Sequence, residues 1–247
     1  MSDAPSFDAV IFDLFGTLVP EFPRSAFYAS VRRMAEVLGA DEGAFIEGWS
    51  DTAILRQTGA YPGGVEENVR AICAALGMAT PSAEAVERAV APRAEMYRRW
   101  FHPRTGAIET LREIKTRGYP LALISMCAPD TPAMWRASDL APFVDIEVFS
   151  SETGLRKPER AIYLHACERL GVAPDRCLYC GDGAYSELTG AQAVGMTAVE
   201  IRDPEIDHDE QLRPEGEDWA GARVADLREL LERLPPTTGD TQARPGT

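Results

Sequence analysis

Four polar residues with complementary chemistry each follow an apolar stretch of this sequence. Asp13 ends "VIFD", Ser125 ends "LALIS", and Asp182 follows "CLYC" after a single glycine. Lys157 lies between the apolar stretch "VDIEVFS" and a helical pattern. Together they offer a carboxylate that can attack an electrophilic centre, a hydroxyl that can donate to a ligand oxygen, an ammonium that can hold an anion, and a second carboxylate.

The two carboxylates also imply a cation. Asp13 and Asp182 would repel each other at short range unless a positive ion lay between them, and hard oxygen ligands of this kind suit Mg²⁺. Gly16, just after Asp13, lets the backbone approach a ligand closely, so that the neighbouring N–H groups can surround an anion. These residues therefore predict magnesium and a small anionic substrate.

The elements that must position these residues are strands that alternate with helices. Apolar stretches at 8–13, 119–125, 144–150, 176–182 and 196–201 predict strands. The segments between them, and a last one at 224–234, have helical spacing. This alternation predicts an α/β protein with a Rossmann-like parallel sheet. Because such sheets bind ligands at the carboxyl ends of their strands, the four polar residues should meet at one edge.

A long insertion interrupts the alternation after the first strand. Residues 20–104 show only helical signals, which we interpret as about four helices at 24–40, 41–57, 63–78 and 82–100. We therefore predict a core of residues 1–19 and 105–234 and an all-helical cap of residues 20–104. Residues 235–247 are rich in proline and glycine and predict a disordered tail. The cap arginines, among them Arg24, Arg32, Arg33 and Arg56, could contact an anionic substrate, but solvated helix faces are the expectation for each.

The composition excludes several kinds of partner. A net charge of −14 repels nucleic acid and anionic lipid. No apolar stretch approaches the ~20 residues that cross a bilayer, and the N-terminus does not resemble a secretion signal. The five cysteines, an odd number, predict free thiols in a reducing cytoplasm, with Cys177 and Cys180 in a buried strand. The oligomeric state is left open.

In their order, these motifs resemble those of the haloacid dehalogenase (HAD) superfamily of hydrolases. The resemblance covers roughly residues 8–201 and rests on "FDLFGTL", Ser125, Lys157 within "GLRKPERAIY", and "GDGAYSELTGAQAVGM". The helical insertion lies between the first two motifs, where that family places a mobile helical cap. A single motif of this kind is weak, whereas four in order together with the insertion are specific.

The resemblance implies a role for each matching residue. Asp13 would be the nucleophile, and its carboxylate, the backbone carbonyl of Phe15 and Asp182 would hold magnesium. Thr17 and Ser125 would contact the transferred group, with Gly16 and Phe15 beside it, and Lys157 would stabilise both Asp13 and that group. Glu187 occupies a place where the family often has a second acid, which would bind a metal water or orient Lys157.

Two residues depart from the pattern of the family's phosphatases. The residue two places after the nucleophile is an aspartate in those enzymes, where it protonates the leaving group, but here it is Phe15. General acid–base catalysis is worth ~10²–10⁴-fold, so ordinary phosphate monoesters should react slowly. Met126 stands where asparagine is common, and it removes a polar contact near the nucleophile loop.

These departures leave three functions open. The first is a magnesium-dependent phosphohydrolase that acts on a small phosphorylated metabolite with a good leaving group. The second is a hydrolase of carbon–halogen bonds, because the family's 2-haloacid dehalogenases have an aromatic residue at this place and a halide leaves without a proton. Asp182 argues against it, since those enzymes lack this acid. The third is a HAD-like binding protein with weak or no turnover.

Overall fold

A six-stranded parallel sheet forms the centre of the computed structural model, which describes residues 7–203, 212, 216 and 218–236. The strand order is β3-β2-β1-β4-β5-β6. The strands are β1 (Ala9–Phe12), β2 (Leu121–Ser125), β3 (Ile146–Phe149), β4 (Cys177–Gly181), β5 (Thr197–Ile201) and β6 (Ala222–Val224). The first strand therefore lies inside the sheet, and the predicted α/β Rossmann-like fold is confirmed.

Helices cover both faces of the sheet because successive side chains of a buried strand point to opposite sides. Val10 and Phe12 pack in one cluster with residues of α6 (Ala107–Thr116), α7 (Thr131–Arg136) and the 3₁₀ helix η5 (Leu227–Arg233). Ala9 and Ile11 pack in the other cluster with α9 (Arg160–Leu170) and α10 (Glu187–Ala193). The sheet is therefore apolar on both faces, as its strand sequences predict.

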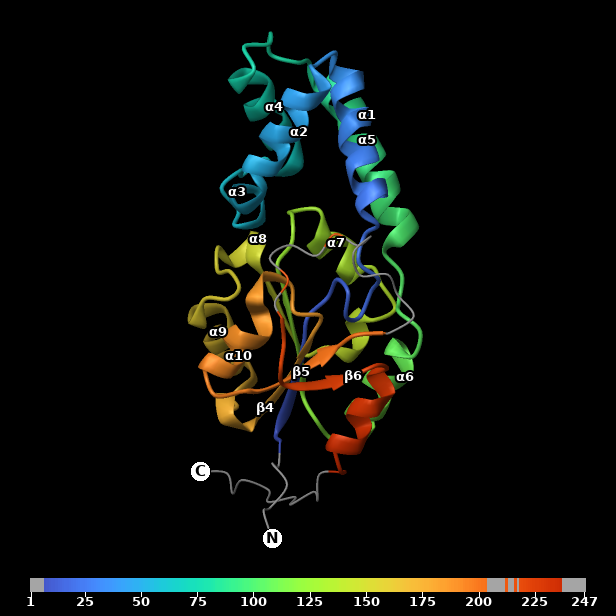
Figure 1. Cartoon of the computed structure of the whole chain (residues 1–247), viewed down its shortest axis with the longest axis vertical. Coiled ribbons are helices and arrows are strands. Elements are labelled where there is room, and N and C mark those ends of the chain that lie inside the picture. Colours follow the sequence, from blue (N-terminus) through green and yellow to red (C-terminus); the bar gives the residue numbers. More distant parts are fainter. Residues whose placement is uncertain (1–6, 204–211, 213–215, 217, 237–247) are drawn as a thin grey trace, which may run out of the picture.

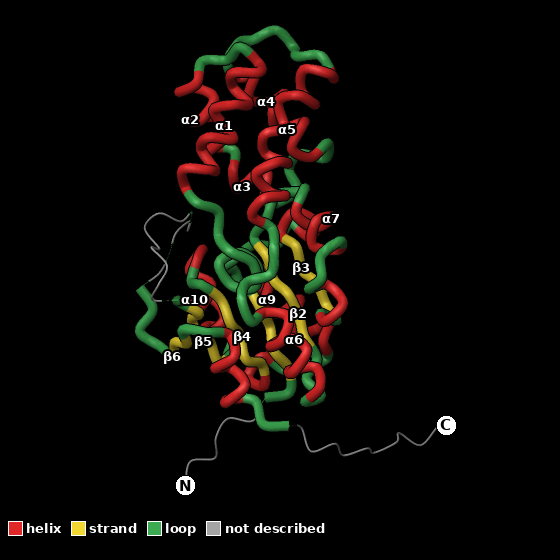
Figure 2. Tube along the Cα trace, turned by 90° about the vertical axis from the view of Figure 1, so that its right-hand side faces the viewer, coloured by secondary structure: helices red, strands yellow, loops and turns green. Residues whose placement is uncertain are grey.

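The insertion after β1 is helical throughout its described elements. It forms α1 (Arg24–Leu38), α2 (Glu42–Asp51), α3 (Ala53–Gln57), α4 (Gly64–Ala75) and α5 (Ala83–Trp100). Figures 1 and 2 show these helices gathered beyond one end of the sheet. They share an apolar core that includes Val31, Phe45 and Ile72. The domain limits at residues 19/20 and 104/105 stay a prediction.

Local capping explains where two of these helices begin. The side chain of Asp41 accepts a hydrogen bond from Ala44 N at 2.9 Å, and that of Ser82 accepts one from Ala85 N at 3.2 Å. The expectation of one helix over 41–57 is wrong, because the chain breaks at Thr52 into α2 and α3. The hydroxyl of Thr52 donates back to Gly48 O at 2.7 Å, a bond that weakens continuation of a helix.

The helix expected over 224–234 is present only over Leu227–Arg233, and it is a 3₁₀ helix. Residues Ala222–Val224 form the edge strand β6, which pairs with β5, and a 3₁₀ helix follows from Leu227. Three residues are too few to show strand alternation in a sequence, so this pairing depends on the neighbouring strand. The carbonyls of Leu231 and Leu234 accept hydrogen bonds from Arg117, which satisfies them without an α-helical turn.

The cysteines have the predicted state. All five are free and buried, and Cys177 and Cys180 lie in β4.

Three helical segments, α8 (Ser150–Thr153), η1 (Ala141–Phe143) and η2 (Pro174–Arg176), complete the connections between the strands, and η3 (Ala184–Ser186) precedes α10.

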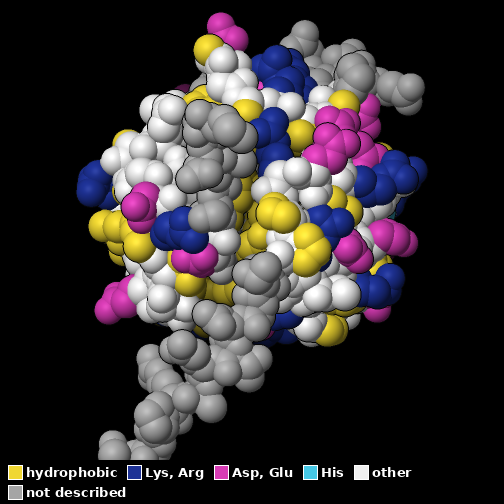
Figure 3. All heavy atoms as spheres, turned by 90° about the horizontal axis from the view of Figure 1, so that it is seen from below, with side chains coloured by type: hydrophobic (Ala, Val, Ile, Leu, Met, Phe, Trp, Pro, Cys, Tyr) yellow, Lys and Arg dark blue, Asp and Glu magenta, His cyan; other side chains and the backbone are white. Residues whose placement is uncertain are grey.

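The end of the molecule opposite the helical insertion has no large patch of one charge among its described residues. Figure 3 shows acidic and basic side chains interspersed there. Within the part of the chain that the structure describes, no helix is both long and apolar enough to cross a membrane. Most of the acidic segment 202–219 and the tail from residue 237 lie outside the described residues, so the predicted disorder of 235–247 stays a prediction.

Candidate active site

Asp13 lies directly beyond the carboxyl end of β1, in the middle of the sheet. Its backbone N–H donates to Cys180 O of the neighbouring strand β4 at 2.9 Å, which continues the ladder by one residue. The residue is buried, with 7% of its surface exposed. The hydroxyl of Thr17, in the turn that follows, donates to Asp13 Oδ2 at 3.1 Å. The short turn therefore orients the carboxylate that the strand places at the edge.

Lys157 joins Asp13 to Glu187 in a buried ion network. Its Nζ lies 2.5 Å from Asp13 Oδ1 and 2.5 Å from Glu187 Oε2. Glu187 Oε2 also accepts from Tyr179 OH at 2.6 Å, and Glu187 Oε1 accepts from Gly183 N at 3.0 Å. Both oxygens of Glu187 thus accept hydrogen bonds. The two carboxylates stabilise the charged ammonium and raise the pKa of Lys157, although burial opposes this shift.

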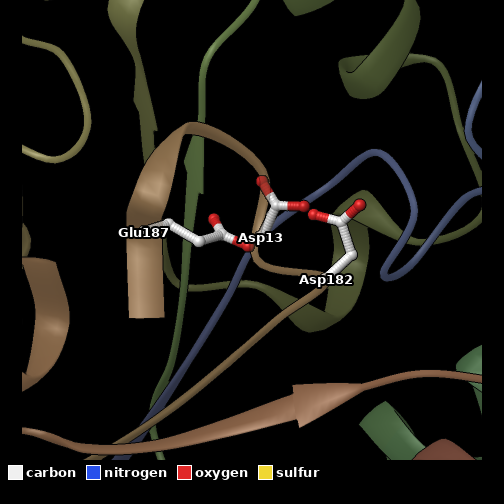
Figure 4. A group of neighbouring side chains, drawn as sticks. All are labelled: Asp13, Asp182 and Glu187. Carbon is white, nitrogen blue, oxygen red and sulfur yellow. The ribbon is translucent and has the colours of Figure 1, made fainter. Parts of the chain in front are cut away.

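Three carboxylates form a compact group at this end of the sheet. Oxygen atoms of Asp13, Asp182 and Glu187 all lie within 4.8 Å of one another. Figure 4 shows Asp13 between the other two, with its carboxylate facing that of Asp182. Burial and the charge of Glu187 raise the pKa of Asp13 to about 7, although Lys157 opposes this rise. Three buried acids against one lysine leave excess negative charge, which fits a divalent cation with oxygen ligands.

Gly16 and Asp182 fit each other closely. Gly16 has φ +77°, and a Cβ atom built there would lie only 2.6 Å from Asp182 Oδ2. A side chain at this position would therefore both strain the backbone and displace the second acid. Asp182 itself is oriented by its neighbour, because its Oδ1 accepts from Ala184 N at 2.9 Å.

Ser125 and Met126 end the strand next to β1. The Oγ atom of Ser125 is buried and has no hydrogen-bond partner of ordinary geometry among the described residues, although it interacts with the thiol of Cys127. An unsatisfied hydroxyl at this end of the sheet is available to a ligand oxygen. Met126 replaces a polar contact with a weak one, because its sulfur accepts the backbone N–H of Lys157 at 3.4 Å.

Phe15 belongs to an aromatic cluster between the sheet and the helical insertion. Its ring centroid lies 5.1 Å from that of Phe22, 6.2 Å from Tyr97 and 5.9 Å from Phe101. These partners come from the nucleophile loop, from α5 and from the segment that returns to the core. The ring offers no proton to a leaving group, so Phe15 makes the wall beside Asp13 apolar.

A cavity of about 420 Å³ lies between the sheet edge and the helical insertion. Asp13 and Phe15 line it, whereas the other predicted site residues do not. Its size is within the ~300–1,000 Å³ of small-molecule sites. Asp13 is thus the carboxylate through which the buried ion network reaches the cavity.

Sequence reasoning missed several residues that line this cavity. Glu21 is one of them, a buried carboxyl that accepts Phe22 N at 2.9 Å and whose pKa is raised well above its usual value by burial and the charge of Asp182. Tyr185 and Gln57 also line the cavity, and Gln57 Nε2 donates a hydrogen bond to Tyr185 OH at 2.8 Å. The place of Glu21 soon after the first motif and that of Tyr185 within the fourth are the only signals that a sequence offers for them, and Gln57 has none.

The expectation that Arg56 lies on a solvated face is wrong. Arg56 is 4% exposed and lines the cavity. Arg24, Arg32 and Arg33 are exposed, and of these Arg24 also lines the cavity. The guanidinium carbon of Arg56 lies 3.9 Å from the ring centroid of Trp49, which also lines the cavity. Helical spacing cannot separate these cases, because α3 is too short to define a face.

Comparison with known proteins places these features in a family. Residues 7–195 match the family described as haloacid dehalogenase-like hydrolase. The chain is similar to a phosphoserine phosphatase of Thermus thermophilus, with 32% identity over 123 residues that cover 49% of this chain and 47% of that protein. It is also similar to a glyceraldehyde 3-phosphate phosphatase of Methanopyrus kandleri, with 27% identity over 203 residues, 78% of this chain and 83% of that protein.

Dehalogenases are also among the relatives. An (S)-2-haloacid dehalogenase 4A of Burkholderia cepacia is 33% identical over 96 residues, which cover 38% of this chain and 41% of that protein. Among solved structures, a HAD phosphatase from Thermococcus onnurineus has a TM-score of 0.62 at 22% identity and covers 92% of this chain and 97% of its own. This last likeness supports the fold.

Proposed function

This chain belongs to the haloacid dehalogenase-like hydrolases, and we propose that within this family it is a magnesium-dependent phosphohydrolase with Asp13 as the nucleophile. The observation that carries the proposal is the group of three buried carboxylates, Asp13, Asp182 and Glu187, with oxygen atoms within 4.8 Å of one another. A carbon–halogen hydrolase needs no such group, whereas a phosphoryl group brings negative charge that a cation must offset.

The chemistry divides among residues that contact one another. Asp13 attacks phosphorus, a bond forms between its Oδ atom and phosphorus, and the bond to the leaving oxygen breaks. Lys157, at 2.5 Å from Asp13, neutralises the nucleophile and the phosphoryl oxygens. Thr17 and Ser125 donate hydroxyl hydrogen bonds to the transferred group. Water then releases phosphate and restores Asp13.

The metal site would consist of the carboxylates of Asp13 and Asp182 and the backbone carbonyl of Phe15. Magnesium bound there would offset the charge of the phosphoryl oxygens. Glu187 binds a metal water or orients Lys157, and its bonds to Lys157, Tyr179 and Gly183 favour the orienting role.

Phe15 restricts the substrate to leaving groups that depart without a proton. Acyl phosphates and aryl phosphates have such leaving groups, since the departing oxygen is a weak base. The cavity of about 420 Å³ favours a small phosphorylated metabolite. Phosphatases among the relatives support the reaction type.

The second candidate is hydrolysis of a carbon–halogen bond. The aromatic ring of Phe15 and its neighbours Phe22 and Tyr97 favour it, because they make an apolar wall beside Asp13 that suits an organic halide. A dehalogenase is also among the relatives.

A substrate screen separates these candidates. Phosphate release from acyl, aryl and alkyl phosphates and halide release from 2-haloacids are measured with magnesium and with a chelator, for the wild type and for Asp13→Asn. Magnesium-dependent phosphate release that Asp13→Asn loses supports the proposal. Halide release that needs no magnesium supports the second candidate. Binding of phosphate esters without any turnover would make the chain a binding protein and refute both.

A further inference from the structure

The end of the cavity formed by the helical insertion contains a buried arginine that has no ion-pair partner among the described residues. Arg56 of α3 is 4% exposed and lines the cavity. Its hydrogen bonds go to neutral acceptors, Trp49 O at 3.1 Å, Asn68 Oδ1 at 2.7 Å and Thr52 Oγ1 at 3.4 Å. Among the described residues, no carboxylate forms an ion pair with it. A charge buried in this way is unfavourable unless something pairs with it.

A second buried arginine of the insertion, Arg93, does have an ion-pair partner. Arg93 of α5 is 3% exposed, and its guanidinium binds both oxygens of Asp130, at 2.7 and 3.2 Å, and Tyr97 OH at 2.6 Å. Asp130 therefore pairs with Arg93 and acts on Arg56 only from a distance, so the two arginines together carry one positive charge more than this carboxylate offsets. Burial and the charge of Arg93 lower the pKa of Arg56 to about 9, which leaves it protonated at neutral pH.

Buried donors at this end of the cavity lack acceptors. Arg56 Nε and Trp49 Nε1 are both buried without a hydrogen-bond partner among the described residues, and both side chains line the cavity. Gln57 Oε1 also lacks a partner there. If this amide turned over, its nitrogen would present a third donor to the cavity, and Tyr185 OH would donate to its oxygen.

We propose that Arg56 and Trp49 bind a carboxylate group of the substrate, so that the substrate is a small phosphorylated carboxylic acid with its two anionic groups at opposite ends of the cavity. One uncompensated positive charge matches the single charge of a carboxylate, and two oxygens match the donors Arg56 Nε and Trp49 Nε1. This inference deepens the proposed function and rests on it for the phosphoryl group alone.

The test uses non-hydrolysable phosphonates, so that binding is measured without turnover. Calorimetry with magnesium compares phosphonoacetate and its homologues with one and two further methylene groups against their primary amides, which have the same shape and no carboxylate charge. In the wild type, at least one acid should bind about tenfold or more tightly than its amide, as expected for hydrogen bonds to a charged group. In Arg56→Gln this preference should disappear, and in Arg56→Lys it should be partly retained.

A matched control comes from another arginine of the insertion. Arg70 of α4 also binds a neutral acceptor, Pro81 O at 2.8 Å, but does not line the cavity. Arg70→Gln should therefore keep the preference for the acid over the amide. Thermal unfolding without ligand shows whether each variant is folded, and Arg56→Lys tests the site should Arg56→Gln unfold.

The two proposals fail in different ways. If each acid and its amide bind equally well to the wild type, the phosphoryl site stands and the carboxylate site is refuted. Propionate, butyrate and valerate complete the test without a phosphonate. If these acids raise the unfolding temperature of the wild type and not that of Arg56→Gln, while phosphonates add nothing, the carboxylate site stands and the phosphohydrolase proposal falls. If neither series binds, both are wrong.

Discussion

Replacement of Phe15 by aspartate should convert this site into one that accepts ordinary alkyl phosphates. The residue lies two places after Asp13 and lines the same cavity, so a carboxyl there can reach a leaving oxygen. General acid catalysis is worth ~10²–10⁴-fold, which corresponds to a barrier lower by about 3–5 kcal/mol. We therefore expect kcat/KM for an alkyl phosphate to rise by a factor in that range.

Phe15→Asp should also lower the free energy of unfolding, because the ring of Phe15 packs against three other aromatic rings. Phe15 has ring contacts with Phe22, Tyr97 and Phe101 at centroid distances of 5.1, 6.2 and 5.9 Å. Each such pair contributes about 0.5–1.5 kcal/mol beyond the apolar area it buries, so the loss of three costs at least about 1.5–4.5 kcal/mol of unfolding free energy. Urea denaturation measures this loss, and it determines the temperature at which the kinetics are done.

The assay compares one alkyl phosphate and one aryl phosphate with saturating magnesium. Phe15→Asn is the matched control, because asparagine has the shape of aspartate and makes the same gap in the aromatic cluster, but it cannot transfer a proton. Only Phe15→Asp should gain activity on the alkyl phosphate, and the aryl phosphate should change little, since its leaving group needs no acid.

Two results would refute this reasoning. Equal gains for Phe15→Asp and Phe15→Asn would show that room in the cavity, and not a proton, limits the reaction. A wild type that hydrolyses alkyl and aryl phosphates equally fast would show that another group supplies the proton. Glu21 is then the first residue to test, as Glu21→Gln, because its carboxyl is buried in the same cavity.

Three further changes test the ion network and the turn after β1. Asp182→Asn should weaken magnesium binding by more than about tenfold in calorimetry, since a charged ligand is lost; unchanged affinity would place the metal elsewhere. Gly16→Ala should also weaken magnesium binding, because its Cβ would lie 2.6 Å from Asp182 Oδ2, whereas Gly39→Ala, with a similar φ of +67° and nothing within 4 Å, should only reduce stability. Lys157→Met should lower the unfolding free energy by about 3–5 kcal/mol, because it leaves two buried carboxylates without their cation. The partly exposed pair of Lys115 provides the comparison, since Lys115→Met should cost about 0–1 kcal/mol in urea denaturation, and equal losses would contradict the buried network.

The sheet and the identity of the residues at its edge can be predicted from the sequence alone. Strands buried on both faces read as continuous apolar runs, and each run here ends beside a polar residue such as Asp13 or Asp182. A parallel sheet binds its ligands at the carboxyl ends of its strands. Residues that directly follow these strands can therefore be expected to lie close together. The departure at Phe15 is also visible without coordinates.

The surroundings of these residues depend on tertiary packing and cannot be predicted from the sequence. The partners of Phe15 come from two parts of the chain, the residues before α1 and the end of α5. Glu187 is held by Lys157 and Tyr179, and none of these contacts is encoded by local spacing. Arg56 reads as a solvated arginine on a short helix, yet packing of α3 against α2 and α4 buries it with no ion-pair partner among the described residues. A sequence shows which residues share a helix face, but the element that packs against that face determines whether a charge meets water, a carboxylate or an open cavity.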